Sequence, residues 1–133
     1  MKEDIINEIL DEIESSLKDP RGISTHQRRL AFSLSLGSVT LLEVYLKELN
    51  MLKPGVKINH QWLKKKKEKI KEIISNYITC PIEKVEHIDE ILDIIYEIEK
   101  ERNELAYGKI VSEKKLGEKI DLFLKLKKIV ENV

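Results

Sequence analysis

The sequence predicts an all-α fold, an antiparallel bundle of about five helices that forms one domain over residues 1–133. Glycine and proline are scarce, with five and three residues, and they fall between long segments, where they indicate loops. Within those segments apolar residues recur every three or four positions, which is the period of an amphipathic helix. A chain of this length with 41% hydrophobic residues suits a single domain with one core.

The first predicted helix covers about residues 3–17. Its apolar stripe lies opposite a row of carboxylates, and the turn sequence KDPRGIST ends it. Ser24 or Thr25 is expected to cap the second helix, because hydroxyl side chains accept hydrogen bonds from the free amides at a helix start. The stripe consists of Ile5, Ile6, Ile9, Leu10, Ile13 and Leu17.

The second segment, HQRRLAFSLSLGSVTLLEVYLKEL, is apolar on most sides. Phe32, Leu34 and Leu36 alternate as they would in a strand. A stretch of about 22 residues without a turn signal, charged only near its ends, instead favours a central helix packed by several neighbours. Gly37 and the serines of this segment would let those neighbours approach closely.

Three further helices follow. A lysine-rich helix over about 60–77 ends at TCP, a fourth covers about 82–106, and Ser112 caps a fifth. One step of four beyond the fourth stripe reaches Arg102, which is therefore expected on the packed face. The inward residues are Trp62, Ile70, Ile73, Ile74 and Tyr77 in the third helix, Ile88, Ile91, Leu92, Ile95 and Ile98 in the fourth, and Leu116, Ile120, Phe123, Leu126 and Val130 in the fifth.

Charge and composition narrow the classes of function. Lys plus Arg and Asp plus Glu number 24 each, so no overall field marks a nucleic-acid coat protein or a polybasic membrane binder. No apolar run approaches the roughly 18 residues of a membrane span, and the acidic start has no signal core. The single cysteine, Cys80, forms no internal disulfide and is expected to act as a small buried hydrophobe. We therefore expect a soluble, cytoplasmic protein with no membrane partner and no cofactor.

Three weaker candidates have simpler interpretations. His26, His60 and His87 are scattered without metal-ligand spacing, so no metal site is predicted. The run KKKKEKIK at 64–71 could follow a phosphate backbone, but a solvated helix face is favoured. HQRR at 26–29 lies near a helix start, where free amides attract anions, although ordinary capping and surface charge are favoured there too.

The segment RNELAYG, residues 102–108, is the strongest candidate site. A guanidinium that continues a stripe of isoleucines must be paired, hydrogen-bonded or placed at an interface. Asn103 and Tyr107 share a helical face, but Arg102 and Tyr107 lie about 140° apart on a regular helix. They converge only if the helix unwinds near Gly108 or if a second subunit supplies one of them. The simpler alternative makes Tyr107 a core residue and pairs Arg102 with Glu97, Glu99 or Glu101.

This segment resembles the arginine-to-histidine signature of the HEPN superfamily. Arg102 and Asn103 precede Glu-Leu-Ala, and Tyr107 stands where the usual signature has histidine, followed by Gly108. The tyrosine is similar to a HEPN branch encoded beside small nucleotidyltransferases, whose motif ends in Asp-Tyr-Gly, except that Ala106 replaces the aspartate. The resemblance is specific over about 88–130 and rests on helix order and length in the first 80 residues.

The resemblance implies a HEPN-like homodimer with the motif in the groove between subunits and, in many members, a metal-independent ribonuclease. Cleaving RNA through its own 2′-hydroxyl needs a base for that proton and a cation for the charge on the phosphoryl oxygens. Arg102 suits the second task through its planar fork. Tyr107 suits the first poorly, because phenols are rarely ionised at neutral pH.

We therefore assign Arg102 and Tyr107 as the candidate catalytic pair, with Asn103, Gly108 and Lys109 as binding residues. The predicted function is that of an RNA-associated or toxin-like protein that works with a nucleotidyltransferase partner and has weak or absent ribonuclease activity. The alternative is a non-catalytic helical dimer or adaptor that binds a protein or a nucleotide in the same groove.

Overall fold

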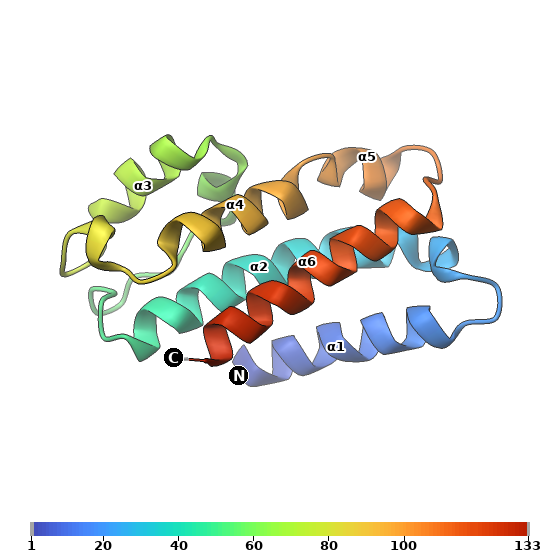
Figure 1. Cartoon of the computed structure of the whole chain (residues 1–133), viewed down its shortest axis with the longest axis horizontal. Helices are drawn as coiled ribbons and strands as arrows, with labels where there is room; N and C mark the ends of the chain where they lie inside the picture. Colours follow the sequence, from blue (N-terminus) through green and yellow to red (C-terminus); the bar gives the residue numbers. More distant parts are fainter. Residues whose placement is uncertain (1, 133) are drawn as a thin grey trace.

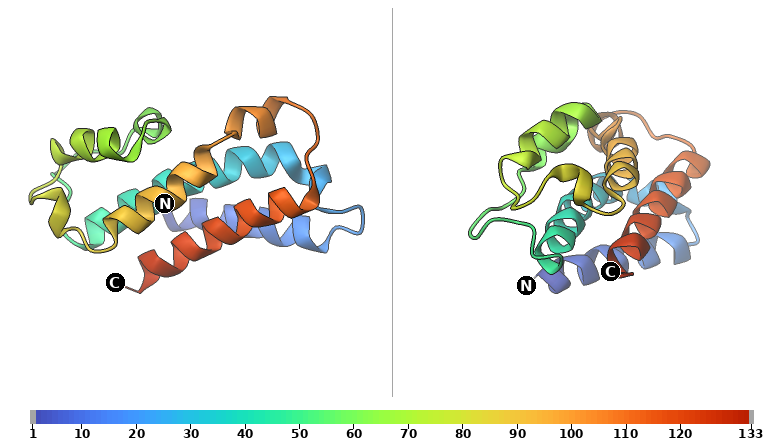
Figure 2. Two further views of the ribbon diagram at one scale, coloured as in Figure 1. Left: turned by 45° about the horizontal axis from the view of Figure 1, so that its top comes forward. Right: turned by 60° about the vertical axis from the view of Figure 1, so that its left-hand side comes forward.

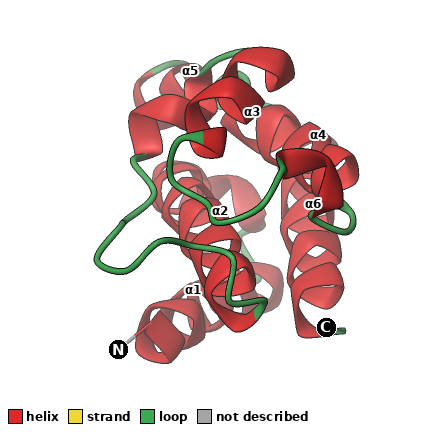
Figure 3. Cartoon of the chain, turned by 90° about the vertical axis from the view of Figure 1, so that its left-hand side faces the viewer, coloured by secondary structure: helices red, strands yellow, loops and turns green. Residues whose placement is uncertain are grey.

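The computed structural model describes residues 2–132 and contains six α-helices, three short 3₁₀ turns and connecting loops. Within that range no strand is present, and only helix and loop are drawn in Figure 3. The predicted all-α bundle is thus confirmed. The helices are α1 (Lys2–Lys18), α2 (Gln27–Glu48), α3 (Lys67–Ser75), α4 (Ile88–Glu99), α5 (Arg102–Tyr107) and α6 (Glu113–Glu131), and the 3₁₀ turns are Ile23–His26, His60–Lys64 and Ile82–Lys84.

The four long elements, namely α1, α2, the consecutive pair α4 and α5, and α6, alternate in direction along the bundle (Figure 1). Helix α2 lies in the centre and contacts α1, α4, α5 and α6, while α3 packs beside α4 at one end (Figure 2). The α1–α2 turn and the α5–α6 connection lie together at the opposite end of the bundle. This arrangement brings the start of α2 next to the predicted motif.

The central position of α2 explains its composition. With the preceding turn it forms a helical stretch, Ile23–Glu48, that is long and apolar enough to cross a membrane, contrary to the expectation that no run approaches that length. Yet 67% of its most apolar window is buried inside the molecule. A helix that is apolar on most sides is the kind that other helices surround in a protein core.

Gly37 allows α2 to approach two neighbours closely. A Cβ atom at this position would lie 2.4 Å from Cε1 of Phe123 on α6 and 2.9 Å from Cδ1 of Ile9 on α1. Ser38 is fully buried and donates from Oγ to the carbonyl oxygen of Leu34 at 2.8 Å, so its hydroxyl leaves no unpaired donor in the core. The prediction that small residues permit close packing of α2 is confirmed.

The apolar stripes are largely confirmed, but two predicted helices are divided. The predicted third helix consists of the 3₁₀ turn His60–Lys64 and then α3. The predicted fourth helix begins at Ile88 and ends at Glu99, and α5 starts only after Glu101, whose φ of 67° is left-handed. Arg102 therefore does not continue the isoleucine stripe. In the first stripe Leu17 is wrong, because its side chain is exposed.

The predicted caps have mixed outcomes. Neither Ser24 nor Thr25 caps α2, because both lie in the 3₁₀ turn that precedes it, and Thr25 donates from Oγ1 to the carbonyl oxygen of Gly22 at 2.9 Å. Ser112 does cap α6, since its Oγ accepts a hydrogen bond from the Lys115 amide at 3.2 Å.

Candidate functional site

The break between α4 and α5 is held by α6. The ammonium of Lys119 donates to the carbonyl oxygens of Glu97 and Lys100, the second at 3.3 Å, and burial lowers the pKa of this lysine. Lys115 pairs with Glu101 in the break itself. Cations at a helix C-terminus satisfy carbonyl groups that have no partner within the helix. These contacts end α4 and let α5 start in a new direction at Arg102.

The far end of the motif is fixed by Gln27 at the start of α2. Its amide nitrogen donates to the carbonyl oxygens of Leu105 at 3.1 Å and Lys109 at 2.9 Å. Its amide oxygen accepts from the Val111 amide at 2.8 Å. Gln27 is buried, so one backbone group in α5 and two in the loop that follows it depend on this one side chain.

Arg28 and Gly108 close the end of α5. Nη1 of Arg28 donates to the carbonyl oxygens of Ala106 and Gly108, both at 3.1 Å. A Cβ atom on Gly108 would lie 2.5 Å from the carbonyl oxygen of Glu104, so close approach of the backbone requires glycine here. Gly108 thus shapes the loop and accepts a hydrogen bond from Arg28, and its role in ligand binding stays a prediction.

The rest of HQRR belongs to an ion-paired network with α1. His26 is buried, with Nδ1 3.0 Å from Oε1 of Glu12 and Nε2 2.9 Å from Oδ2 of Asp19. Arg29 donates from Nε to the same Glu12 oxygen at 2.8 Å. The Arg21 guanidinium, the Arg21 amide and His26 hold the pKa of Asp19 below its usual range. The favoured interpretation of HQRR, capping and surface charge, is right only for the surface position of Arg28 and Arg29, because His26 and Gln27 are buried and no side chain caps the start of α2.

Arg102 and Tyr107 meet at a third residue, Phe32 on α2. Cζ of Arg102 lies over the Phe32 ring, 5.1 Å from its centroid. The ring of Tyr107 lies 5.8 Å from that of Phe32 at an interplanar angle of 79°, an edge-to-face contact. Tyr107 is 72% exposed, so it is not a core residue. The two residues reach one surface without unwinding of the helix and without a second subunit, because both contact Phe32 of α2.

Arg102 has no carboxylate partner among the described residues. Its Nη1 donates to Oδ1 of Asn103 at 3.1 Å, and its Nε is buried without a hydrogen-bond partner. The alternative in which a neighbouring glutamate pairs with Arg102 is wrong for all three candidates. Glu99 bonds to Ser35, Glu101 pairs with Lys115, and no ion pair within 4.0 Å joins Glu97 to Arg102.

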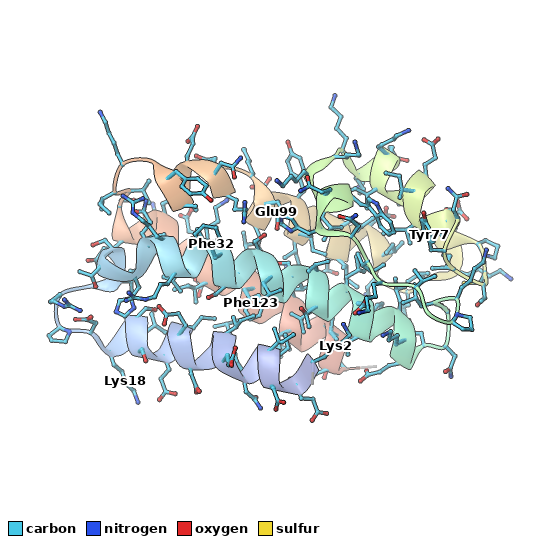
Figure 4. All side chains as sticks on the ribbon, turned by 180° about the vertical axis from the view of Figure 1, so that it is seen from behind. Lys2, Lys18, Phe32, Tyr77, Glu99 and Phe123 are labelled. Carbon is cyan, nitrogen blue, oxygen red and sulfur yellow. The ribbon has the colours of Figure 1, made fainter. Side chains whose placement is uncertain are left out.

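Glu99 belongs to a buried polar cluster that the sequence did not reveal. Its Oε1 accepts from Ser35 Oγ at 2.6 Å, and its Oε2 is buried without a partner among residues 2–132. Nδ1 of His60 lies 3.4 Å from Ser35 Oγ and 4.0 Å from Glu99 Oε1. Burial lowers the pKa of His60, and Arg102 also lowers it, while Glu99 acts in the opposite direction. Figure 4 shows Phe32 and Glu99 on neighbouring elements of the bundle.

Glu99 and Arg102 line the same pocket, which has a volume of about 340 Å³. Its cationic side chains are Lys64, Lys100 and Arg102, and Asn103 also lines it. Tyr107 and Lys109 are not among its lining residues; Lys109 is exposed. The full lining is Leu63, Lys64, Tyr96, Glu99, Lys100, Glu101, Arg102, Asn103 and Glu104.

Two further lysines of 64–71 form ion pairs with α4. Lys67 lies 3.2 Å from Asp93, and Lys71 pairs with Asp89. These pairs agree with the favoured interpretation of a solvated helix face. Lys64 is the member of the run that lines the pocket, so any phosphate contact from this segment would come from its first residue.

No known protein family, curated protein or solved structure matches the chain. Within residues 2–132 no group of three or more His, Cys, Asp or Glu side chains is arranged to hold a metal ion. Cys80 is half-buried against the core. Fold and site together define an all-α bundle with an arginine stacked on an exposed aromatic ring beside a buried carboxylate.

Proposed function

We propose that the chain is a HEPN-like, RNA-associated protein of the cytoplasm, toxin-like in character, that binds phosphate-bearing ligands at Arg102. The observation that carries this proposal is the state of Arg102. Its guanidinium lies over the Phe32 ring and lines the pocket, and no carboxylate among residues 2–132 forms an ion pair with it. A planar guanidinium with donors to spare recognises phosphate oxygens, and exposed aromatic rings stack on nucleic-acid bases.

Catalysis in this proposal is weak or absent. Tyr107 is exposed and touches Phe32 through an aromatic contact, so it supplies a hydrogen-bond donor or a stacking surface. A phenol at neutral pH is a poor base for a ribose hydroxyl. The nucleotidyltransferase partner is proposed from the HEPN resemblance of RNELAYG.

Binding and metal-free cleavage of a short single-stranded RNA test the proposal. Arg102→Ala should abolish most salt-dependent binding, and Arg102→Lys should not restore it, because lysine keeps the charge but loses the planar fork. Arg21→Ala removes the same charge from the exposed α1–α2 turn and serves as the matched control. Equal affinities for wild type and Arg102→Lys would mean that the arginine has no recognition role.

Substitutions of Tyr107 separate binding from catalysis. Tyr107→Phe should preserve folding and most of the affinity for RNA. Tyr107→His restores the usual family residue and should raise metal-independent cleavage, because imidazole is largely available as a base at neutral pH. Brisk cleavage by wild type that Tyr107→Phe removes would show that the phenol is a working catalyst. A folded, dimeric Tyr107→His without activity would contradict a latent nuclease.

One observation favours the second candidate function, a helical dimer or adaptor. Phe32 and Leu36, one turn apart on α2, are 41% and 49% exposed, and Tyr107 and Ile110 beside the motif are more exposed still. Clustered exposed apolar side chains are typical of protein interfaces. Light scattering at tens of micromolar tests the dimer, since an interface of about micromolar affinity is occupied there. A Leu36→Glu variant that stays as dimeric as wild type would remove this surface from the interface.

A further inference from the structure

The pocket beside Arg102 contains an exposed aromatic side chain, Tyr96 of α4. Its exposed fraction is 41%, and it lines the pocket wall. Tyr77 and Tyr107 each contact another aromatic ring, and Tyr45 is buried in the core. Within residues 2–132 Tyr96 makes no contact with another aromatic ring. Its ring is therefore free to stack against a planar ligand.

Two lysines of the same pocket, Lys64 and Lys100, are exposed and form no ion pair within residues 2–132. Lys64 ends the 3₁₀ turn His60–Lys64, which contacts α4, and Lys100 directly follows α4. The Lys100 amide donates to the carbonyl oxygen of Tyr96 at 2.8 Å. An exposed ring and an exposed cation thus come from one helical turn, and a second cation comes from the turn that packs against it.

The carboxylates of the pocket offset these cations only in part. Glu101 pairs with Lys115, so its charge is neutralised. Glu99 and Glu104 are not paired with any lysine or arginine of residues 2–132. The three cationic side chains, the two lysines and Arg102, therefore exceed the two remaining carboxylates by one charge. Such a wall suits a phosphate group, which accepts charge-assisted hydrogen bonds from lysine and arginine.

Arg102 lies between this pocket and a second aromatic surface. Its Cζ lies 5.1 Å from the centroid of the Phe32 ring, which contacts Tyr107. The Nη1 contact with Asn103 lies at the surface, so the guanidinium meets a ligand through its Nη end and not through the buried Nε. Proteins bind single-stranded RNA by stacking successive bases on aromatic rings while cations follow the phosphates. A cation between two exposed tyrosines has the order of groups that such a strand requires.

We propose that Tyr96 is a second base-stacking residue, so that the site binds two consecutive nucleotides of single-stranded RNA. One base stacks on Tyr107, the next base stacks on Tyr96, and the phosphate between them contacts the Nη groups of Arg102. The phosphate beyond the second base contacts Lys64 and Lys100. The pocket volume of about 340 Å³ lies within the range of roughly 300–1,000 Å³ that small-ligand sites occupy. This inference rests on the proposed RNA association and adds the length of RNA that the site recognises.

The test uses a short RNA of two adenosines with a phosphate at each end, pApAp, and two versions in which one or the other adenine is replaced by hydrogen. NMR titration measures the affinities. One base stacked on an aromatic ring contributes about fivefold or more in affinity. Wild type should therefore bind pApAp at least about fivefold more tightly than either abasic version. Tyr96→Leu should lose this factor for pApAp and match wild type on one abasic version, and Tyr107→Leu should match wild type on the other.

Two variants serve as controls. Tyr96→Phe keeps the face of the ring and should bind pApAp as tightly as wild type. Leu124→Ala shortens an apolar side chain of α6 that is 38% exposed and lies outside the pocket. It should leave the affinities for all three ligands unchanged.

Each outcome separates this inference from the function on which it rests. A wild type that binds no single-stranded RNA of any length would contradict RNA association itself. Binding of pApAp that Arg102→Ala weakens and Tyr96→Leu leaves unchanged would keep the proposed function and overturn the role of Tyr96. Binding of longer RNA without binding of pApAp would overturn the two-nucleotide site, as would a Tyr96→Leu loss that is equal for both abasic versions. If Tyr96→Leu does not fold, the ring protons of Tyr96 in wild type decide the matter. They should shift with pApAp and with only one abasic version, and unchanged ring signals overturn the stacking.

Discussion

Replacing Gly37 by alanine should destabilise the protein, although alanine is the better helix former. Removing a glycine from a helix interior gains about 0.4–1 kcal/mol. The new methyl group would lie 2.4 Å from the Phe123 ring and 2.9 Å from Ile9. Both are buried, and forcing extra volume into a packed core costs about 1–3 kcal/mol. The expected net loss of unfolding free energy is therefore about 0–2.6 kcal/mol.

Gly117 provides the matched control, because it also lies within a helix and a Cβ atom there would meet no atom within 4 Å. Gly117→Ala should stabilise by about 0.4–1 kcal/mol. Urea unfolding followed by circular dichroism, at one protein concentration for all variants, should thus separate the unfolding free energies of the two variants by about 1–3 kcal/mol. Thermal unfolding should separate their Tm values by roughly 3–6 °C for each kcal/mol. Equal stabilisation of both variants would refute close packing of α2 against α6 and α1.

Three further predictions concern the elements around the site. Lys119→Met leaves the carbonyl oxygens of Glu97 and Lys100 without their donor and should cost about 1–3 kcal/mol in urea unfolding, whereas the exposed Lys114→Met should cost little. Gln27→Leu removes the hydrogen bond to Leu105 in α5 and both hydrogen bonds to the α5–α6 connection, and it should speed amide exchange at Val111 without changing exchange in α3. Burial lowers the pKa of His60, so the imidazole takes up a proton at higher pH in the unfolded chain than in the folded protein. The free energy of unfolding should therefore fall as the pH drops below about 6.5 and level off below the folded pKa. His60→Asn should lose less stability than wild type between pH 7.5 and 5.5, and parallel stability curves for the two proteins would contradict the lowered pKa.

The fold class and most of the core could be predicted from sequence because helical periodicity is a local signal. All five residues of the predicted α6 stripe and all five of the α4 stripe are buried. The break after Glu99 could not be predicted in the same way. It depends on Lys119, an α6 residue that caps α4 from a distant part of the sequence. A stripe of isoleucines carries no information about a lysine on another helix.

The site was predictable only in part for the same reason. Arg102, Asn103 and Tyr107 follow from one short segment, but Phe32 comes from α2 and Ser35 from the next turn of that helix. A signal for Phe32 existed, because large apolar residues at positions 32 and 36 occupy one helical face. We expected several neighbours to cover α2, and this face is left exposed. The sequence predicts Glu99 only as a possible ion-pair partner of Arg102, and its contact with Ser35 is visible only in the fold.

Arg102 and Tyr107 are close in the motif, but only Arg102 both contacts the aromatic surface and lines the pocket. Arg102 contacts Phe32, which also contacts Tyr107, and it lines the pocket that contains Glu99, whereas Tyr107 is not among the lining residues. A change at Tyr107 should therefore alter the stacking surface, a change at Glu99 should alter the buried polar cluster with Ser35, and only a change at Arg102 should affect both. The arginine is shared because α5 starts in a new direction after Glu101, and that start depends on the contacts of α6 with the end of α4. The chemistry of the motif is thus tied to a helix break that lies outside the motif itself.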